Sequence, residues 1–269
     1  MSIINGKMLI FIPTYDEHEN VTEMCKQLHE LELDGDILFM DDNSPDGTGA
    51  ILENLALQYP RMTVLHRTGK LGIGSAHLDG ITWAYDHDYD TLVTLDCDFT
   101  HAPTDIPRLL QQPDNFELTV GSRYMAENSL PNWNLIRRFL TNFGHFLTRW
   151  LLGIRHDATG ALRVYRINRI PREVFGLVRA RSYGFFFESM YILGSNGVRI
   201  AEVPIVLPNR MYGHSKMSLR EVWRSGMQVL SLAALNIFRP SQFRIRRPAG
   251  AAVSHPAKLP APLAPTQKG

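Results

Sequence analysis

Cysteine is scarce in this chain, and so is net charge. The 269 residues include two cysteines, Cys25 and Cys97, which lie far apart and show no metal-ligand spacing. They predict neither a zinc site nor a disulfide framework, and they suit a reducing, cytoplasmic compartment. The formal net charge is +1, whereas a nucleic-acid-binding protein that relies on bulk charge carries a large positive excess. We therefore expect no nucleic-acid partner.

Long apolar runs are missing as well. The longest candidate, residues 227–238, is interrupted by Gln228, Ser231 and Asn236, and it is much shorter than the roughly 20 residues that span a bilayer. No basic segment followed by an apolar one opens the sequence, so no signal peptide is visible. With 44% hydrophobic and 20% charged residues, the chain is expected to form one large globular domain, with or without appendages.

Apolar segments of strand length alternate with segments of helical periodicity in the first half of the chain. Strands are expected at residues 8–12, 36–40, 62–65, 91–95 and 116–121, and helices at 17–31, 48–58 and from 72 onward. This alternation predicts an α/β fold with a mostly parallel sheet that has helices on both faces. In the second half, helices are expected at 134–153 and 218–238, and short strands at 157–167 and 198–207.

The composition changes once more at Pro240. Arg244, Arg246 and Arg247 make the next residues basic, and the remainder of the chain is rich in alanine and proline. Such a segment cannot bury enough apolar surface to fold by itself. We therefore expect a folded domain over residues 1–239 and a disordered tail over 240–269, whose deletion should leave ligand binding intact.

The most informative segment is 94–101, where an apolar run leads directly into Asp96 and Asp98. Carboxylates two residues apart on an extended chain point to the same side, so both can face one cation. Mg²⁺ or Mn²⁺ held by one or two carboxylates, with phosphate oxygens completing the shell, is typical of nucleotide-dependent proteins. A pair of aspartates that caps a loop is the alternative, and this segment alone leaves it open.

Acidic residues also follow two other expected strands, at Asp16 and Glu17 and at Asp41 and Asp42. Because parallel strands end at one edge of their sheet, the three groups should converge on a single crevice. This negative charge needs a cation or a hydrogen-bonding ligand, and a nucleoside diphosphate with a divalent metal supplies both. Asp16, like Asp46 in the following turn, could instead be a helix N-cap.

Several of these segments, in this order, resemble the motifs of the dolichol-phosphate mannose synthases, which are inverting glycosyltransferases of the GT-A fold. The matching segments are Pro-Thr-Tyr-Asp-Glu at 13–17, Asp-Asp-Asn-Ser-Pro-Asp-Gly-Thr at 41–48, Asp-Cys-Asp at 96–98, Gly-Ser-Arg-Tyr at 121–124 and Arg-Met-Tyr-Gly-His-Ser-Lys at 210–216. The resemblance covers roughly residues 8–220. It departs from the family pattern at Asp16, where Asn is usual, and at Cys97, Phe99 and Thr100, but it keeps both carboxylates.

The resemblance implies roles for the matching residues. The residues implied to bind the nucleotide are Pro13, Tyr15, Glu17, Met40, Asp42, Asp96 and Cys97. Asp98, helped by Thr100 and next to Asp96, would hold Mg²⁺ or Mn²⁺ at the diphosphate. Arg210 and Lys216 would engage the donor diphosphate from a loop, while Arg123 and Arg137 would hold an acceptor phosphate. Asp98 and these four basic residues are therefore the residues implied to act in catalysis.

The implied reaction moves mannose from GDP-mannose to a dolichyl or polyprenyl phosphate, with inversion. A phosphate acceptor is already anionic near neutral pH, so it needs no general base. UDP-glucose or another nucleotide sugar is compatible with the same motifs. Transfer to a hydroxyl would demand a base, for which Glu188 is the candidate, although a structural helix-face acid is the equal alternative. A non-catalytic subunit that binds nucleotide sugars is the alternative from another class.

A lipid acceptor would bring the chain to a membrane surface. Residues 133–154 mix large apolar residues with arginines, and residues 222–247 are apolar and then basic, as in helices at a bilayer interface. A helix that packs against a core shows the same pattern. We expect peripheral contact with the cytosolic face of a membrane, which in some family members involves small membrane subunits.

Overall fold

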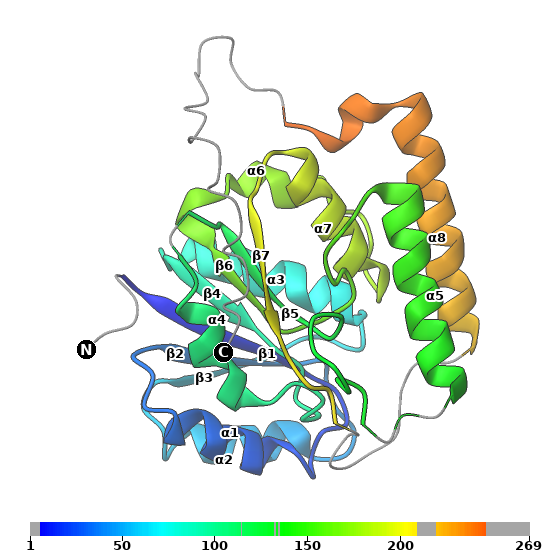
Figure 1. Cartoon of the computed structure of the whole chain (residues 1–269). Helices are drawn as coiled ribbons and strands as arrows, with labels where there is room; N and C mark the ends of the chain where they lie inside the picture. The colour runs from blue at the N-terminus through cyan, green and yellow to red at the C-terminus, as the bar shows by residue number, and fades with distance from the viewer. Residues whose placement is uncertain (1–5, 114, 132, 134, 209–218, 246–269) are drawn as a thin grey trace, which may run out of the picture.

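A computed structural model of the chain describes residues 6–113, 115–131, 133, 135–208 and 219–245, with side chains for all of these except 136, 137 and 219–222. In this part of the chain, seven strands form one sheet in the order β3-β2-β1-β4-β6-β5-β7 (Figure 1). The strands are β1 (Met8–Thr14), β2 (Asp36–Asp41), β3 (Met62–His66), β4 (Thr91–Thr94), β5 (Leu118–Ser122), β6 (Arg163–Arg166) and β7 (Ile200–Pro204).

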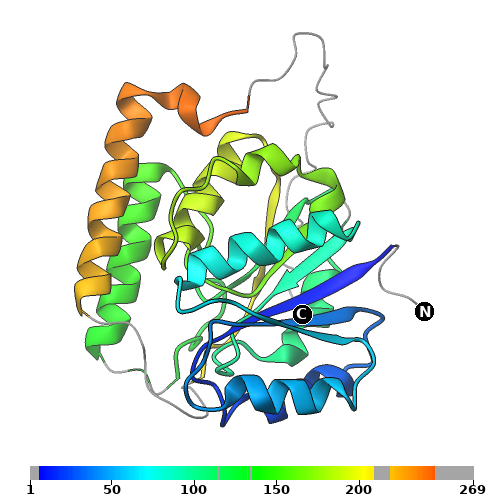
Figure 2. The same cartoon turned by 180° about the vertical axis from the view of Figure 1, so that it is seen from behind.

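Helices cover both faces of the sheet (Figures 1 and 2). The longer ones are α1 (Val21–Glu30), α2 (Thr48–Ala56), α3 (Ile73–Asp86), α5 (Leu135–Leu152), α7 (Gly184–Ser195) and α8 (Leu219–Phe238). The shorter ones are α4 (Ile106–Leu110), α6 (Arg172–Phe175) and the 3₁₀ turns η1 (Pro103–Asp105), η2 (Ile167–Arg169) and η3 (Pro240–Phe243).

The sheet is mostly parallel, which confirms the predicted fold class. The exception is β6, which runs antiparallel to both of its neighbours: Val164 lies opposite Val93 of β4 and Thr119 of β5. Because β6 reverses direction between them, β4 and β5 run the same way. The carboxyl ends of β1, β2, β4 and β5 therefore lie along one edge of the sheet, where open α/β sheets bind their ligands.

Side chains of β1 alternate between two apolar cores. Leu9 and Phe11 enter the core shared with α3, α6 and α7, whereas Met8, Ile10 and Ile12 enter the core shared with α1, α2 and α4. Successive side chains of a strand point to opposite faces, so apolar residues at every position mean that both faces are covered. This pattern explains why β1 reads as a continuous apolar run.

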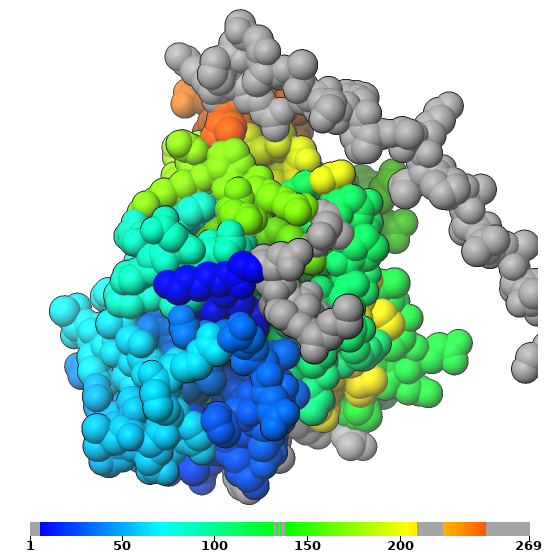
Figure 3. Space-filling view, turned by 90° about the vertical axis from the view of Figure 1, so that its left-hand side faces the viewer, coloured from blue at the N-terminus to red at the C-terminus, as the bar shows by residue number. Residues whose placement is uncertain are grey.

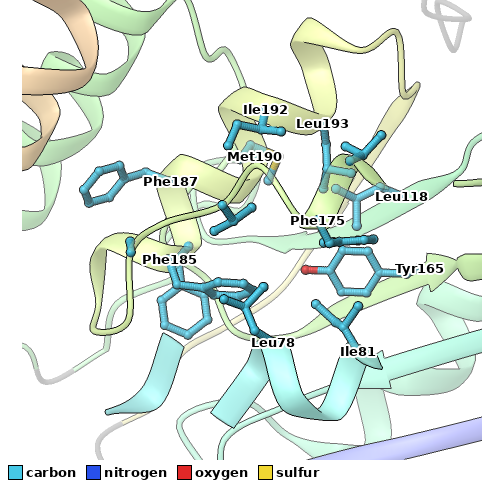
Figure 4. Close-up of a cluster of buried hydrophobic side chains, with 14 of the residues drawn as sticks. Leu78, Ile81, Leu118, Tyr165, Phe175, Phe185, Phe187, Met190, Ile192 and Leu193 are labelled. Atoms are coloured by element: carbon cyan, nitrogen blue, oxygen red, sulfur yellow. The ribbon is translucent and has the colours of Figure 1, made fainter. Parts of the chain in front are cut away.

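The core under α3 and α7 is aromatic (Figure 4). Tyr165 of β6 meets Phe175 edge-on with ring centroids 5.8 Å apart, and His77 of α3 stacks on Phe185 with centroids 5.1 Å apart. Neither ring nitrogen of His77 has a hydrogen-bond partner among the described residues. Burial, together with the charge of Arg163, lowers the pKa of His77 to about 3, so the ring is neutral at pH 7.

Arg163 of β6 is fully buried. Its guanidinium donates hydrogen bonds to the carbonyl oxygens of Gly160 at 2.9 Å, Ala158 at 3.0 Å and Phe186 at 2.8 Å, and to the Ser189 hydroxyl at 3.0 Å. Within the described residues, no carboxylate pairs with it. Backbone and hydroxyl oxygens thus replace water around this charge, and they tie the 158–160 turn and β6 to the start of α7.

Residues 240–245, which their composition placed in the tail, pack on the domain. Phe243 is 5% exposed and meets Tyr191 of α7 edge-on with ring centroids 5.2 Å apart. The Asn196 amide donates to the carbonyl oxygen of Phe243 at 2.8 Å and accepts from the Ile245 backbone N–H at 2.9 Å. The folded unit therefore continues to Ile245, and residues 246–269 lie outside the described residues.

The chain is arranged in two blocks and a pair of edge helices. In Figure 3, the residues of the first third of the chain, coloured blue to cyan, occupy one block, and green to yellow residues occupy the other. Helices α5 and α8 stand side by side at the edge of the molecule (Figures 1 and 2). Neither of them, nor any other helix in the described segments, has the length and apolar character needed to cross a bilayer.

Candidate active site

A cavity of about 300 Å³ opens at the carboxyl ends of β1, β2 and β4. The structure brings acidic residues from all three strand ends to it, as the parallel order predicted. The residues that line it are Pro13, Thr14, Tyr15, Glu17, Asp42, Lys70, Gly72, Ile73, Ala76, Asp96, Cys97, Asp98, Ser182 and Tyr183.

Asp98 is fixed by the turn that follows β4. The residue is 4% exposed, and its Oδ1 accepts hydrogen bonds from the Thr100 backbone N–H at 3.0 Å and the Thr100 hydroxyl at 2.6 Å. These two bonds fix the orientation of the carboxylate without any ligand. Thr100 therefore acts on Asp98 directly, which agrees with the helping role that the resemblance implied.

Three strand ends at the cavity share an uncommon backbone conformation. Asp16 (φ 52°), Asn43 (φ 57°) and Phe99 (φ 60°) are non-glycine residues in the left-handed region, which few such residues adopt. Asp16 lies between two lining residues, Asn43 follows Asp42, and Phe99 follows Asp98. One residue with a left-handed backbone conformation thus follows each of the strands β1, β2 and β4.

Asp42 reaches the cavity with its carboxylate already engaged. Its Oδ1 accepts from the Arg67 guanidinium, and its Oδ2 accepts from the Leu71 backbone N–H at 3.2 Å. Arg67 also contacts the Ser75 hydroxyl and pairs with Asp79 at 2.9 Å. Arg67, which we did not predict from the sequence, fixes Asp42 and joins the end of β3 to α3.

Two other aspartates of the β2 turn have structural roles. Asp41 is buried, and its Oδ1 accepts from the Thr14 hydroxyl at 3.2 Å and the Ser44 hydroxyl at 2.5 Å. Asp46 accepts from the Thr48 backbone N–H at 3.0 Å, but the N-cap of α2 is Gly47, so Asp46 shapes the turn before the helix and is not the N-cap that the alternative expected. Burial would raise the pKa of Asp46, but its hydrogen bonds from Thr48 and His18 lower that pKa to about 2.

Lys70 adds a positive charge to the acidic cavity. Its Nζ lies 3.9 Å from the centroid of the Tyr15 ring, which is within the range of a cation–π contact. We did not predict Lys70 from the sequence. The feature that could have indicated it is its position directly before the turn that opens α3.

The wall opposite the strand ends comes from the segment before α7 and packs closely on α3. Gly72 has a φ of 97°, and a Cβ on it would lie 2.4 Å from the Arg181 carbonyl oxygen. The Ser75 backbone N–H donates to that same oxygen at 3.0 Å. Gly72 therefore serves a turn and a close packing contact.

Glu188 supports this wall from behind. It is 3% exposed, and its Oε2 accepts from the backbone N–H groups of Arg179 at 3.2 Å and Ala180 at 2.6 Å. Burial raises the pKa of Glu188, although these backbone hydrogen bonds oppose the shift. Glu188 does not line the cavity, so its structural alternative describes it better than the role of a general base does.

Arg123 lies in a buried pair beside the cavity. Its Nε and backbone N–H both donate to Asp157 Oδ2, at 2.7 Å and 3.2 Å. Burial alone would lower the pKa of the guanidinium, but the Asp157 carboxylate raises it above its usual value, and Asp96 contributes in the same direction. Asp96 thus lies within electrostatic range of Arg123. Asp157 thus holds Arg123, which the resemblance implies to bind the acceptor phosphate.

His101 completes this second polar group. It is 5% exposed, and its Nε2 has no hydrogen-bond partner among the residues that the structure describes. A Cβ on Gly160 would lie 3.8 Å from that atom and 3.7 Å from Nη2 of Arg123, so the two side chains flank the same glycine. Burial and the charge of Arg123 lower the pKa of His101 to about 4, which keeps the ring neutral at pH 7.

The remaining expected site residues lie elsewhere. Met40 pairs in register with Pro13, but its side chain is buried in the core under α3 and does not line the cavity. The Arg137 side chain, Arg210 and Lys216 lie outside the described residues. No cluster of three or more His, Cys, Asp or Glu side chains suited to a metal occurs in the described segments.

Comparison with known proteins identifies the family. The model of glycosyl transferase family 2 matches residues 9–170. The polyprenol monophosphomannose synthase of Mycolicibacterium smegmatis is 38% identical over 215 residues, which cover 79% of this chain and 81% of that protein. The undecaprenyl-phosphate mannosyltransferase of Micrococcus luteus is 35% identical over 213 residues, which cover 79% of this chain and 88% of that protein.

Solved structures share the fold at low sequence identity. Mannosyl-3-phosphoglycerate synthase from Rubrobacter xylanophilus has a TM-score of 0.63 and 16% identity, and the match covers 92% of this chain and 79% of that one. Glucosyl-3-phosphoglycerate synthase from Mycobacterium tuberculosis, solved with Mn²⁺ and UDP, has a TM-score of 0.59 and 19% identity, with 86% and 80% covered. These neighbours confirm the GT-A fold, and the match to more than half of the chain shows that this protein belongs to glycosyl transferase family 2.

Proposed function

We propose that this glycosyltransferase moves mannose from GDP-mannose to the phosphate of a polyprenol, with inversion at the sugar. The observation that carries the proposal is the cavity at the strand ends, where Asp96 and Asp98 meet, in a chain 38% identical to a polyprenol monophosphomannose synthase. A phosphate-bearing donor suits this site because its diphosphate can share a cation with the two carboxylates.

Mg²⁺ or Mn²⁺ fits the donor atoms present. Asp96 and Asp98 offer hard carboxylate oxygens at the cavity wall, and the Thr100 hydroxyl keeps Asp98 in a fixed orientation. The two residues leave most of the coordination sphere to oxygens of the donor diphosphate, as such cations accept. When bound, the cation neutralises charge that develops on the leaving diphosphate.

The nucleotide would lie along the residues that follow β1 and β2. Pro13, Tyr15 and Glu17 line that side, and Arg67 holds Asp42 in place there. The ammonium of Lys70 over the Tyr15 ring supplies a charge that can approach either a phosphate or the face of the base. Arg210 and Lys216 remain predicted ligands of the diphosphate.

The acceptor phosphate would lie beside Arg123. Asp157 occupies the Nε of this arginine, which leaves its two terminal nitrogens to donate to a phosphate. A phosphate oxygen of the acceptor forms the bond to the anomeric carbon while the bond from that carbon to the diphosphate breaks, and GDP leaves. The attacking oxygen is anionic near pH 7, so no general base is required. Arg137 remains a predicted second ligand of this phosphate.

The alternative acceptor, a hydroxyl, has less support. It requires a general base, and Glu188, the candidate from the sequence, uses its carboxylate on the backbone of residues 179 and 180. UDP-glucose remains the second candidate for the donor, because the residues that line the cavity do not by themselves select guanine over uracil.

The test is a panel of nucleotide sugars with Mn²⁺ or Mg²⁺ and a short-chain polyprenyl phosphate, assayed for lipid-linked sugar. We expect turnover with GDP-mannose and at least about tenfold less with UDP-glucose. A preference for UDP-glucose would replace the donor in this proposal. Absence of turnover with every donor would contradict the proposed reaction.

The lipid acceptor also implies peripheral contact with a membrane. The relatives in Mycolicibacterium smegmatis and Micrococcus luteus are named for polyprenol and undecaprenyl-phosphate substrates, which supports the same class of acceptor here. We place the enzyme on the cytosolic face, where nucleotide sugars would reach it, and fractionation of cells into soluble and membrane material tests this placement.

A further inference from the structure

Helix α5 exposes its largest side chains. Leu135, Phe139, Phe143, Phe146 and Trp150 are between 46% and 81% exposed, and their spacing of three or four residues places them along one face of the helix. The opposite face carries Thr148 and Leu152, which are buried. A helix that only packed against a core would turn its aromatic face inward.

Helix α8 repeats the arrangement beside it. Trp223, Met227, Leu230, Ile237 and Phe238 are between 48% and 80% exposed, again at helical spacing. Val229 and Leu232 on its other face are buried. Because α5 and α8 lie side by side at the edge of the molecule (Figures 1 and 2), each adds to a large apolar area, which we call the α5/α8 face. A contiguous exposed apolar face on a folded domain marks an interaction site.

Basic residues accompany the α5/α8 face. Arg138 and Arg149 are exposed, and since they are eleven residues apart, or about three helical turns, they lie on the same side of α5. Arg224 on α8 and Arg239 after it are also exposed. The sequence of α5 contains no acidic residue, and that of α8 contains Glu221 alone.

We propose that the α5/α8 face docks on the surface of a lipid bilayer that contains anionic lipids. Exposed aromatic and aliphatic side chains enter the region between headgroups and acyl chains, while flanking arginines bind the anionic headgroups. A second copy of this chain in a symmetric contact would offer these arginines no carboxylate from α5 and only Glu221 from α8. A neutral bilayer would leave the arginines without partners. Charge complementarity therefore selects the anionic bilayer.

The α5/α8 face is connected to the proposed acceptor site. Tyr124, the residue after Arg123, stacks on His145 of α5 with ring centroids 3.9 Å apart and an angle of 17° between the rings. Its hydroxyl donates to the carbonyl oxygen of Thr141 on α5 at 3.2 Å. A bilayer bound to α5 would therefore contact the helix on which Tyr124 packs, and Tyr124 is the neighbour of Arg123 in the chain. This step rests on the proposed function, whereas docking itself does not.

Vesicle flotation with the full chain and no polyprenyl phosphate tests the docking. Wild-type protein should bind phosphatidylcholine vesicles that contain phosphatidylglycerol, and bind pure phosphatidylcholine vesicles much more weakly. The double variant Phe143→Ser/Trp150→Ser should lose about tenfold or more of the affinity. The double variant Arg138→Gln/Arg149→Gln should lose roughly fivefold for each arginine on the anionic vesicles, and little on the neutral ones.

Matched controls come from the far side of the molecule. Leu57→Ser removes an apolar side chain that is 86% exposed after α2, and Lys26→Gln removes an exposed charge from α1; both should bind vesicles like the wild type. Unchanged vesicle binding by both double variants would overturn the proposal. A dimer in lipid-free solution that Phe143→Ser/Trp150→Ser dissociates would assign the face to a second copy and would also overturn it.

Turnover of a short, water-soluble acceptor separates this inference from the proposed function. We expect the Phe143→Ser/Trp150→Ser enzyme to transfer sugar to that acceptor at the wild-type rate, while its activity on acceptor embedded in anionic vesicles falls with its vesicle affinity. Vesicle binding that follows the expected pattern in a protein that turns over no donor would refute the proposed reaction and leave the docking surface in place. Equal activity on both acceptors in the variant would refute the link between docking and acceptor supply.

Discussion

The residues from β1 to α4 hide their large apolar side chains, whereas α5 and α8 display theirs. Among the described residues, the exposed large apolar side chains before residue 113 are Leu57 and Leu71, while α5 carries six and α8 carries five. The first region buries its apolar side chains in cores that it shares with the rest of the domain. The second region leaves the α5/α8 face uncovered. The proposed bilayer would cover these side chains.

Both regions combine local and distant partners for buried charge. In the first, Asp98 and Asp41 accept hydrogen bonds within their own turns, from Thr100 and Ser44, while Asp42 pairs with the distant Arg67. In the second, Arg163 donates to the nearby carbonyl oxygens of Ala158 and Gly160 and to the distant one of Phe186. Asp98 can therefore be oriented by its own turn, whereas Arg163 is fully satisfied only when α7 packs on β6.

The largest expected effect is in the first region, at the cavity. Asp98→Ala removes a carboxylate that we place on the metal, and metal-dependent turnover should fall by about a thousandfold. The free energy of unfolding should fall by about 1 to 3 kcal/mol, because the two hydrogen bonds from Thr100 lose their acceptor. Turnover of GDP-mannose across a Mn²⁺ titration measures the effect. Asp86→Ala, which removes an exposed carboxylate at the end of α3, is the control, and equal turnover in the two variants would contradict the metal assignment.

The next effect should appear in the second region, as lost stability. Arg163→Met leaves the carbonyl oxygens of Ala158 and Gly160 without the Arg163 donor, at about 1 to 3 kcal/mol for each unsatisfied group, whereas the Phe186 oxygen keeps a hydrogen bond from the Ser189 hydroxyl at 3.2 Å. The free energy of unfolding should fall by at least about 2 kcal/mol, which corresponds to roughly 4 to 8 °C in melting temperature. Arg155→Met, at an exposed position in the same segment, should melt like the wild type. Melting of Arg163→Met at the wild-type temperature would show that the buried charge does not organise this region.

Variants of Glu188 distinguish a structural role in the cavity wall from a role as general base. Glu188→Ala should lose about 2 kcal/mol of unfolding free energy, because the N–H groups of Arg179 and Ala180 lose their acceptor. Glu188→Gln keeps an acceptor oxygen and should stay within about 1 kcal/mol of the wild type, with turnover on a phosphate acceptor within about threefold. Thermal melts and initial rates measure both. Abolished turnover in a stable Glu188→Gln protein would restore the general-base alternative.

The effect that is smallest at neutral pH concerns His77 and the dependence of stability on pH. Its folded pKa of about 3 lies below the unfolded value of about 6.5, so its contribution is fully present above pH 6.5 and is lost as the pH falls toward 3. In that window the unfolding free energy should decrease by up to about 1.4 kcal/mol per pH unit. His77→Leu should remove this slope, which denaturant melts at several pH values measure. The same slope in both proteins would mean that His77 is hydrated in the folded state.

The sequence predicts the first region better than the second, for physical reasons. A strand buried on both faces leaves an apolar run, and the acids that follow it mark the sheet edge, so the sequence alone places Asp42, Asp96 and Asp98 near one another. These signals are local. The direction of β6 depends on its pairing with β4 and β5 instead, and no residue within Arg163–Arg166 encodes that direction.

The missed residues share this dependence on distant partners. Arg67 acts through Asp42, 25 residues away in the chain, and its sequence position looks like an ordinary surface arginine after a strand. His101 could have been noticed, because it follows Thr100 directly in the segment that carries Asp96 and Asp98. The aromatic residues of α5 were legible as a face, but periodicity alone does not say whether such a face turns inward or outward.

The left-handed turns at Asp16, Asn43 and Phe99 bear on how tightly the cavity can hold a ligand. A loop that must order itself around a ligand loses conformational entropy on binding, and the affinity is reduced by that amount. Each of these turns has its conformation imposed by folding, against the ordinary preference of a non-glycine residue. The entropy of the cavity rim is therefore given up when the chain folds, and the donor nucleotide meets a rim that is already ordered.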